Sequence, residues 1–231
     1  MILKATEIAK LLDQGISRTE TGDPLVVAPC PDLEELKNSG SASIDLRLGT
    51  WFVLLREYRM TYLRIVDEKE KNEPEDELES GNGGKRPSEA WAEKPHTKHY
   101  YVPFGESFFL HPGCFALGVT LEWLRMPSGL AGYVVGRSSW GRRGLIIASA
   151  FGVHPGFTGC LTLELSNIGE IPIEIMPGLT ICQLFIHRVE GEGAEGDKTP
   201  FIGQRRPMVS EIYLDSVAQK LKSAYRSSKG K

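Results

Sequence analysis

The sequence predicts an all-β protein, and two features of its central part carry this prediction. From Tyr100 to Val189, short apolar stretches alternate with turn residues at regular intervals, which is typical of a barrel or roll and not of a βαβ fold. Proline presets φ and glycine permits positive φ, so a Pro-Gly pair is suited to a type II turn. Three such pairs each precede an apolar strand of similar length: Pro112-Gly113, Pro155-Gly156 and Pro177-Gly178.

Shorter elements are expected on either side of this β-rich part. Thr6 to Gly15 is predicted to be a helix, with Thr6 as its N-cap, Ile8 on its apolar face and Gly15 at its end. Irregular chain rich in Pro and Gly follows, and strands are expected from Ser43 to Leu55. Near the carboxyl end, Ser210 to Ser223 is predicted to form a terminal helix.

Residues 67–99 differ from their surroundings, because they are highly charged and contain few apolar side chains. Burial of so few apolar groups does not offset the entropy lost on ordering. We therefore expect a mobile surface insertion within a single domain that spans residues 1–231. A functional lid is the alternative interpretation of the same segment.

Composition excludes several classes of function. The chain has 231 residues, is 41% hydrophobic and carries a net charge of −3, so no overall basic surface attracts nucleic acid or anionic membranes. Phosphate recognition must then be local. The amino-terminal residues are too charged for a signal peptide, and no apolar run has the length of a membrane span. We expect a cytoplasmic protein.

The cysteines point to a reducing compartment. None of the 4 cysteines forms a C-x-x-C pair. Cys114, Cys160 and Cys182 lie in apolar, strand-like surroundings, for which buried free thiols are the expected explanation.

The segment from Gly136 to Asn167 contains the candidate phosphate-binding and catalytic residues. Its Arg137-Ser138-Ser139 loop offers two hydroxyls, backbone N–H groups and a cation, which are groups that bind phosphate. Further along, polar residues alternate with leucines, so Glu164 is predicted on the polar face of a strand whose other face is apolar. A phosphate-binding loop and one directed carboxylate indicate an enzyme that acts on a phosphorylated small molecule. The plainer alternatives are an ordinary loop and a solvated glutamate.

This segment resembles the dCTP deaminase branch of the dUTPase superfamily. Four further stretches resemble motifs of that family: S-A-S-I-D-L-R-L-G at 41–49, L-H-P-G-C-F-A-L-G-V-T-L-E at 110–122, I-P-I-E-I-M-P-G-L-T-I-C-Q-L-F-I at 171–186 and F-I-G-Q-R-R-P at 201–207. The resemblance implies a distorted β-barrel of the dUTPase-like or β-clip type, with a closing segment at about 198–231. It also implies a homotrimer with shared active sites, whose partners are dCTP and dUTP rather than nucleic acid or membranes.

The resemblance assigns roles to individual residues. Glu164 matches the catalytic glutamate, Ser138 approaches the catalytic water, and Arg142 holds the carboxylate, whereas Arg143 is read as a solvated residue. The residues expected to contact the substrate lie in the triphosphate loop, in the 148–153 hairpin, which contributes its backbone, and in the closing segment. They are Arg137, Ser138, Ser139, Ala150, Gly152, Val153 and Gln204. Arg205 and Arg206 add positive charge beside Gln204. Mg²⁺ is expected to accompany the triphosphate, with no protein metal ligands.

The implied reaction is hydrolysis of dCTP to dUTP and ammonia. The chain lacks the H-x-E and C-x-x-C patterns of zinc deaminases, so a zinc-independent reaction with Glu164 as base and acid is expected. His154 stands where superfamily members often carry the Asp that activates water in dUTPases, so release of dUTP is expected. The alternative functions are a dUTP diphosphatase, a bifunctional enzyme and a non-catalytic nucleotide sensor. The alternative for His154 is that it only packs or forms hydrogen bonds in the turn.

Overall fold

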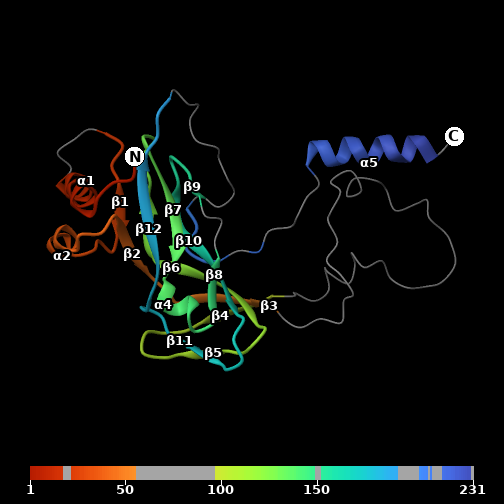
Figure 1. Ribbon diagram of the computed structural model, residues 1–231, viewed down its shortest axis with the longest axis horizontal. Helices are drawn as coiled ribbons and strands as arrows, with labels where there is room; N and C mark the ends of the chain where they lie inside the picture. Colours follow the sequence, from red (N-terminus) through yellow and green to blue (C-terminus); the bar gives the residue numbers. More distant parts are fainter. Residues whose placement is uncertain are drawn as a thin grey trace. The chain divides into compact units, whose positions relative to one another are not determined.

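Strands are the commonest secondary structure in the part of the chain that the computed structural model describes, which comprises residues 1–17, 22–55, 97–148, 152–191, 203–207, 209 and 215–229. The chain divides into one unit of residues 1–55 and 97–208 and a second of residues 56–96 and 209–231. The elements (Figure 1) are α1 (Ala5–Ser17), β1 (Val26–Ala28), α2 (Leu33–Asn38), β2 (Ser43–Arg47), β3 (Trp51–Leu55), β4 (Thr97–Tyr101), β5 (Phe108–Leu110), β6 (Phe115–Arg125), β7 (Leu130–Gly136), α4 (Ser138–Gly141), β8 (Leu145–Ala148), β9 (Gly152–Val153), β10 (Thr158–Asn167), β11 (Ile173–Ile175), β12 (Thr180–Arg188) and α5 (Ser216–Lys229).

The strands of the first unit form three antiparallel sheets. The largest has the order β4-β3-β6-β10-β8, with β1 paired to β6 beside β3. A second sheet has the order β2-β12-β7-β9, and β5 pairs with β11 in a third. The expected mainly β fold is confirmed, and the sheets form open paths instead of one closed ring, as in a distorted barrel. Whether the chain is a single domain stays a prediction.

The Pro-Gly turns lie where the sequence predicts them. Gly113, Gly156 and Gly178 have φ of 75°, 77° and 90°, in the left-handed region that glycine adopts without steric cost. The long strands β6, β10 and β12 begin two residues after these glycines. Each turn therefore sets the start of a strand that carries core residues.

The helices differ from the prediction at their ends. Helix α1 continues through Gly15 to Ser17, so Gly15 does not end it. A Cβ on Gly15 would lie 2.6 Å from the carbonyl oxygen of Leu25, so the glycine allows close packing of the helix on the following chain. Helix α2 lies in the stretch expected to be irregular, and its N-cap Asp32 accepts hydrogen bonds from two backbone N–H groups.

The predictions for the 67–99 insertion and for the carboxyl-terminal helix agree with the structure only in part. Most of the 67–99 insertion lies outside the described residues, but Thr97–His99 belong to β4 and pair with β3, which corrects the carboxyl boundary. In the second unit, α5 begins at Ser216 because Asp215 caps it, accepting from the N–H groups of Val217 and Ala218.

Among the described helices, none is long and apolar enough to cross a membrane.

The cysteine prediction is correct for one residue and wrong for another. Cys182 is buried in β12, whereas Cys160 is half-buried and Cys114 is exposed, because Cys114 follows the Pro112-Gly113 turn before β6 begins. Burial raises the pKa of the Cys182 thiol to about 12, with the carboxylates of Glu122 and Asp45 acting in the same direction.

We expect an alkylating reagent at pH 8 to modify Cys114 in the folded protein and to leave Cys182 unmodified. The thiolate is the reactive form, and burial both disfavours it and blocks access to Cys182. Peptide mass spectrometry after timed labelling measures both rates, and labelling in denaturant is the control that should make them similar. Equal rates in the folded protein would contradict the burial of Cys182.

Candidate active site

The Arg-Ser-Ser loop lies between β7 and β8 and is fixed to the central strand of the second sheet. The N–H of Arg137 donates to the carbonyl of Ile181 at 3.1 Å, and the indole Nε1 of Trp140 donates to the carbonyl of Thr180 at 3.0 Å. Both acceptors belong to β12. Residues 138–141 form the single turn α4 between these two contacts. The loop is thus attached to the sheet at both ends.

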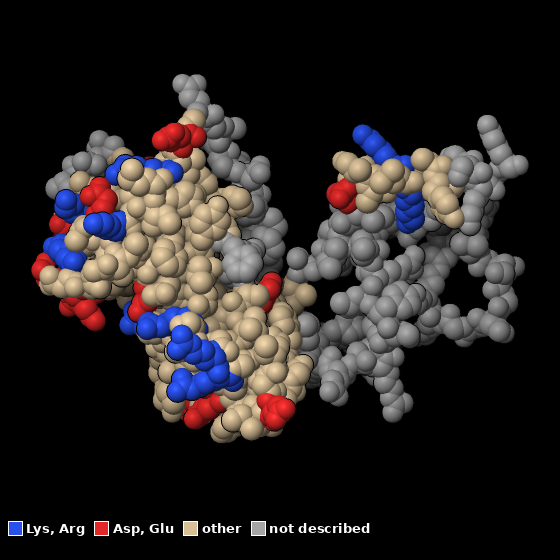
Figure 2. Space-filling model, viewed as in Figure 1, with Lys and Arg blue, Asp and Glu red and all other residues tan. Residues whose placement is uncertain are grey.

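Between these attachments, the donors of Ser138 and Ser139 face solvent. Both residues are exposed, and within the described part of the chain neither their hydroxyls nor their N–H groups donate a hydrogen bond. Arg142 and Arg143 follow directly and are exposed as well. Figure 2 shows a group of Lys and Arg side chains over the position of α4. The loop therefore presents hydrogen-bond donors and positive charge together, which suits an anion such as a phosphate chain.

Arg137 is held by a carboxylate that the sequence reasoning missed. Its Nη1 lies 2.6 Å from Oδ2 of Asp45 in β2, and Oδ1 of Asp45 accepts a hydrogen bond from Nε2 of Gln183 at 2.9 Å. Asp45 stands in the S-A-S-I-D motif that carries part of the family resemblance. That motif was the available signal, but it did not show which side chain Asp45 meets.

Glu164 lies in β10 as the alternating pattern predicts. The flanking Leu163 and Leu165 are fully buried, whereas Glu164 is exposed. Glu164 pairs with Leu117 of β6 on one side and with Ala148 of β8 on the other. Within the described residues its carboxylate makes no hydrogen bond or ion pair. A carboxylate in this position is free to accept a proton from a bound water molecule.

Within one chain, the loop and Glu164 lie apart. Strand β8 starts just after the loop with Leu145, which pairs with Asn167, and ends with Ala148, which pairs with Glu164. Three residues of strand correspond to about 10 Å. Among the described residues no hydrogen bond or ion pair joins Glu164 to Ser138 or Arg142. The predicted contact between Arg142 and Glu164 is therefore absent within a single chain.

The hairpin predicted to read the pyrimidine is described only in part. Ala150 lies outside the described residues, while Gly152 and Val153 form β9 and pair with β7. Gly152 is exposed and Val153 is buried at 2% exposure. The Val153 side chain thus belongs to the core, and only its backbone is available to a substrate. His154 follows in the turn, is exposed, and its carbonyl accepts from the N–H of Phe157 at 3.2 Å.

The carboxyl-terminal segment docks on the start of β10. The N–H of Cys160 donates to the carbonyl of Gln204 at 2.8 Å, and the N–H of Gly203 donates to the carbonyl of Thr158 at 2.6 Å. The guanidinium of Arg206 lies 3.9 Å from the ring centre of Trp51, a cation–π contact. These contacts fix residues 203–206 to the body of the first unit.

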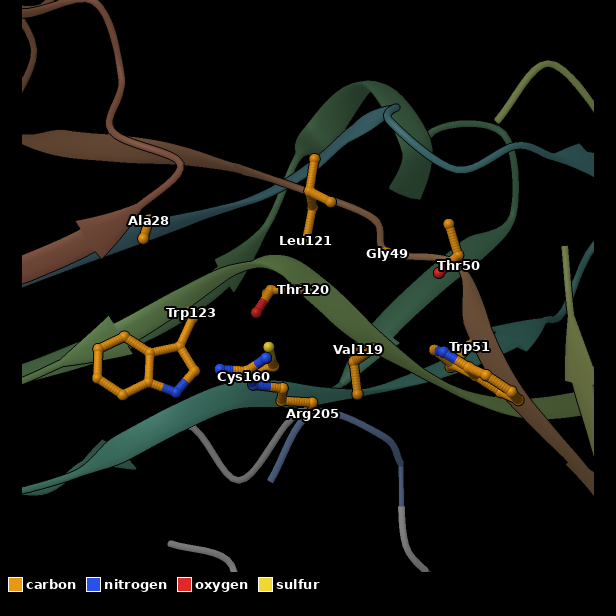
Figure 3. A pocket seen from close by; sticks show the side chains of 10 residues that line it. All are labelled: Ala28, Gly49, Thr50, Trp51, Val119, Thr120, Leu121, Trp123, Cys160 and Arg205. Atoms are coloured by element: carbon orange, nitrogen blue, oxygen red, sulfur yellow. The ribbon is translucent and has the colours of Figure 1, made fainter. Parts of the chain in front are cut away.

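Next to this segment is a pocket of about 490 Å³ (Figure 3). In this view Trp123 and Trp51 lie on its two sides with Arg205 between them. The pocket opens on one edge of β6, between the end of β1 at Ala28 and the start of β3. The predicted loop residues and Glu164 do not line it.

The pocket shares a sheet face with Glu164. Cys160 pairs with Trp123, and Thr162 pairs with Val119. On β10, Cys160 lies four residues before Glu164 and Thr162 lies two residues before it. Along β10, Cys160 and Thr162 alternate onto the face that carries Glu164, although the register with β6 shifts between Cys160 and Thr162. Four residues of β10 separate Cys160 from Glu164, or about 13 Å. The closing segment therefore contacts the same strand that carries Glu164.

Together these features define a mainly β protein in which a loop with exposed hydrogen-bond donors and cations, and the exposed carboxylate of Glu164, are positioned by paired strands. The model of the dCTP deaminase-like family matches residues 2–189. This chain belongs to the dCTP deaminase-like family. The match confirms the resemblance drawn from the motifs and the expectation of an enzyme.

Similar proteins cover almost the whole chain. A protein of Kocuria rhizophila named "dCTP deaminase, dUMP-forming" is 33% identical over 93% of this chain and 96% of its own length. One of Natronomonas pharaonis named "dCTP deaminase" is 34% identical over 93% and 96%. The crystal structure of 2'-deoxycytidine 5'-triphosphate deaminase from Agrobacterium tumefaciens has a TM-score of 0.49 and 21% identity over 82% of this chain, and this chain spans about half, 48%, of that chain.

Proposed function

We propose that this protein hydrolyses dCTP to dUTP and ammonia without zinc, with Glu164 as the proton-transferring residue. The observation that carries the proposal is the exposed Glu164 on a strand whose other face is buried, in a chain related over 93% of its length to proteins named dCTP deaminase. An exposed carboxylate on a central strand has a fixed position, because its neighbours on both sides are paired.

The proposed chemistry needs one base that later serves as an acid. Glu164 accepts a proton from water while the water oxygen bonds to C4 of cytosine. The carboxylic acid delivers this proton to N3, which takes up the electrons of the C4=N3 double bond. Glu164 then accepts the proton of the new C4 hydroxyl and passes it to the exocyclic nitrogen, the C4–N bond breaks, and ammonia leaves as the C4 carbonyl of uracil forms. One water is consumed and one ammonia is released for each dCTP. General acid–base catalysis of this type contributes about 10²- to 10⁴-fold in rate.

The loop supplies the triphosphate site in this proposal. Ser138 and Ser139 donate from hydroxyls and N–H groups, while Arg137 and Arg142 neutralise charge. The loop offers donors and cations but no carboxylates, so it suits the phosphate oxygens and not the metal. Mg²⁺ then arrives as part of the substrate, held by the triphosphate. Among the described residues, no three His, Cys, Asp or Glu side chains gather in a metal-binding group.

We further propose that the active site is shared between subunits of a homotrimer. Among the described residues of one chain, no hydrogen bond or ion pair joins the exposed Glu164 to Ser138 or Arg142, and we infer that a single subunit lacks a complete site. The loop of a neighbouring subunit supplies the missing groups. The segment with Gln204 and Arg205 contacts the start of β10, and in this proposal it covers the triphosphate from the subunit that provides the carboxylate.

A second candidate function is the two-step conversion of dCTP to dUMP, ammonia and pyrophosphate. It is favoured by the relatives, since those from Kocuria rhizophila, Corynebacterium jeikeium and Methanobrevibacter smithii are all named dUMP-forming. Their names differ from the dUTP product that His154 leads us to expect. Attack on the α-phosphorus needs a second base, which Glu164 or the exposed His154 would have to provide.

Separate measurement of ammonia, dUTP, dUMP and pyrophosphate tests both candidates. Incubation with dCTP and Mg²⁺ is expected to release one ammonia per nucleotide, and dATP, dGTP and dTTP are the matched controls that release none. Accumulation of dUTP supports the argument from His154. Stoichiometric dUMP and pyrophosphate from the earliest time points support the second candidate. Absence of ammonia would refute the proposed function.

A further inference from the structure

The contacts of Arg137 extend the proposed triphosphate site to a residue outside the loop. Asp45 lies 92 positions earlier in the chain and Gln183 lies 138 positions from Asp45, yet the three side chains are joined at 2.6 Å and 2.9 Å. We propose that Asp45 is a positioning residue for triphosphate binding, which holds the Arg137 guanidinium beside the donors of Ser138 and Ser139. This inference rests on the proposed function of the loop.

The sheet register explains how Asp45 reaches the loop. Asp45 of β2 pairs with Gln183 of β12, and Gln183 pairs with Val135 of β7. The three residues form one row across the sheet and point to the same face. Arg137 follows Val135 by two positions, directly after β7 ends at Gly136. The strand therefore delivers the Arg137 side chain to the carboxylate of Asp45.

Both oxygens of Asp45 are engaged, which limits the orientations of the ion pair. Oδ2 accepts from Nη1 of Arg137 and Oδ1 accepts from the Gln183 amide. A guanidinium has five N–H donors in a rigid plane, so one bond to Asp45 leaves the others available to phosphate oxygens. Holding an arginine side chain before the ligand arrives removes part of the ordering cost of binding.

The exposure of the Arg137–Asp45 ion pair favours a positioning role over a role in the stability of the fold. The Arg137 and Asp45 side chains are 37% and 49% exposed. Ion pairs this exposed contribute little to folding. Asp45 also places a negative charge near the proposed triphosphate, which opposes binding. Since water screens that repulsion and the hydrogen bonds act directly on Arg137, we expect the positioning effect to be the larger one.

Titration calorimetry with inorganic tripolyphosphate tests this without requiring turnover. Asp45→Asn keeps the size of the side chain but removes its charge, and tripolyphosphate is expected to bind about three- to fivefold more weakly, the scale of one exposed ion pair. Asp23→Asn is the matched control, because Asp23 is similarly exposed at 43% and pairs with Arg125 away from the loop. Its affinity and the melting temperatures of both variants should stay unchanged.

An Arg137→Ala background separates positioning from a general effect of charge. If Asp45 acts through Arg137, Asp45→Asn should cause no further loss of tripolyphosphate affinity there. In turnover assays Asp45→Asn should raise KM for dCTP with little change in kcat, since binding is affected and the chemistry is not. Unchanged or tighter tripolyphosphate binding by Asp45→Asn would overturn the inference. An unmodified protein that binds tripolyphosphate but releases no ammonia would instead refute the proposed function alone.

Discussion

Replacing Glu164 with Gln is expected to lower the rate of ammonia release from dCTP by about 10²-fold or more, with affinity for dCTP nearly unchanged. The amide has the shape of the carboxylate but cannot take the proton of the attacking water. Because the Glu164 side chain is exposed and makes no hydrogen bond or ion pair within the described residues, the substitution should not disturb folding. Turnover assays and calorimetry with dCTP measure the two quantities separately.

The control for this variant is Glu170→Gln. Glu170 is another exposed glutamate, placed in the bend between β10 and β11, and no catalytic role is assigned to it. Its replacement changes the net charge by the same amount and should leave turnover at the level of the unmodified protein. Near-normal turnover by Glu164→Gln would remove Glu164 from the mechanism, whereas equal losses in both variants would indicate an effect of charge alone.

Mixing two impaired variants is expected to restore activity if the active site is shared. Ser138→Ala chains keep the carboxylate, and Glu164→Gln chains keep an intact loop. After equal mixing and random exchange in a cyclic oligomer, about one quarter of the sites combine an intact Glu164 with an intact neighbouring Ser138. Ammonia release should therefore rise from near zero toward a quarter of the unmodified rate.

A double variant provides the control for the mixing experiment. Glu164→Gln chains mixed with chains that carry both substitutions contain no intact carboxylate, so they should stay inactive under the same exchange conditions. Subunit exchange is verified by mass spectrometry of differently labelled chains, and light scattering should show a trimer. Proven exchange without restored activity would place Ser138 and Glu164 in the same subunit's site.

Local patterns in the sequence were sufficient for the elements that position the proposed site. The alternation around Glu164 predicted its exposed place on β10, because a strand buried on one face requires apolar residues at every second position. The Pro-Gly pairs predicted the turns before β6, β10 and β12, since positive φ is a local property of glycine. The family motifs between residues 41 and 186 lie within the match to the family model, whereas the motif at 201–207 lies outside it.

Other local expectations failed where neighbouring parts of the fold decide the outcome. Gly15 looked like a helix end, but the helix continues and the glycine admits the close approach of Leu25. Cys114 looked like a core thiol, but the turn before β6 leaves it exposed. In both cases the sequence pattern was compatible with two structures, and the place of the residue in the fold selected one of them.

The sequence by itself determined the β-rich architecture, the Arg-Ser-Ser loop with its hydrogen-bond donors and the face on which Glu164 lies, because each depends on residues close together in the chain. Only the tertiary structure showed that Asp45 and Gln183 hold Arg137, that Gln204 docks on the start of β10, and that strand β8 separates the loop from Glu164. These relations depend on sheet register between segments far apart in sequence. Register is set by the pairing of whole strands, so no single motif contains it.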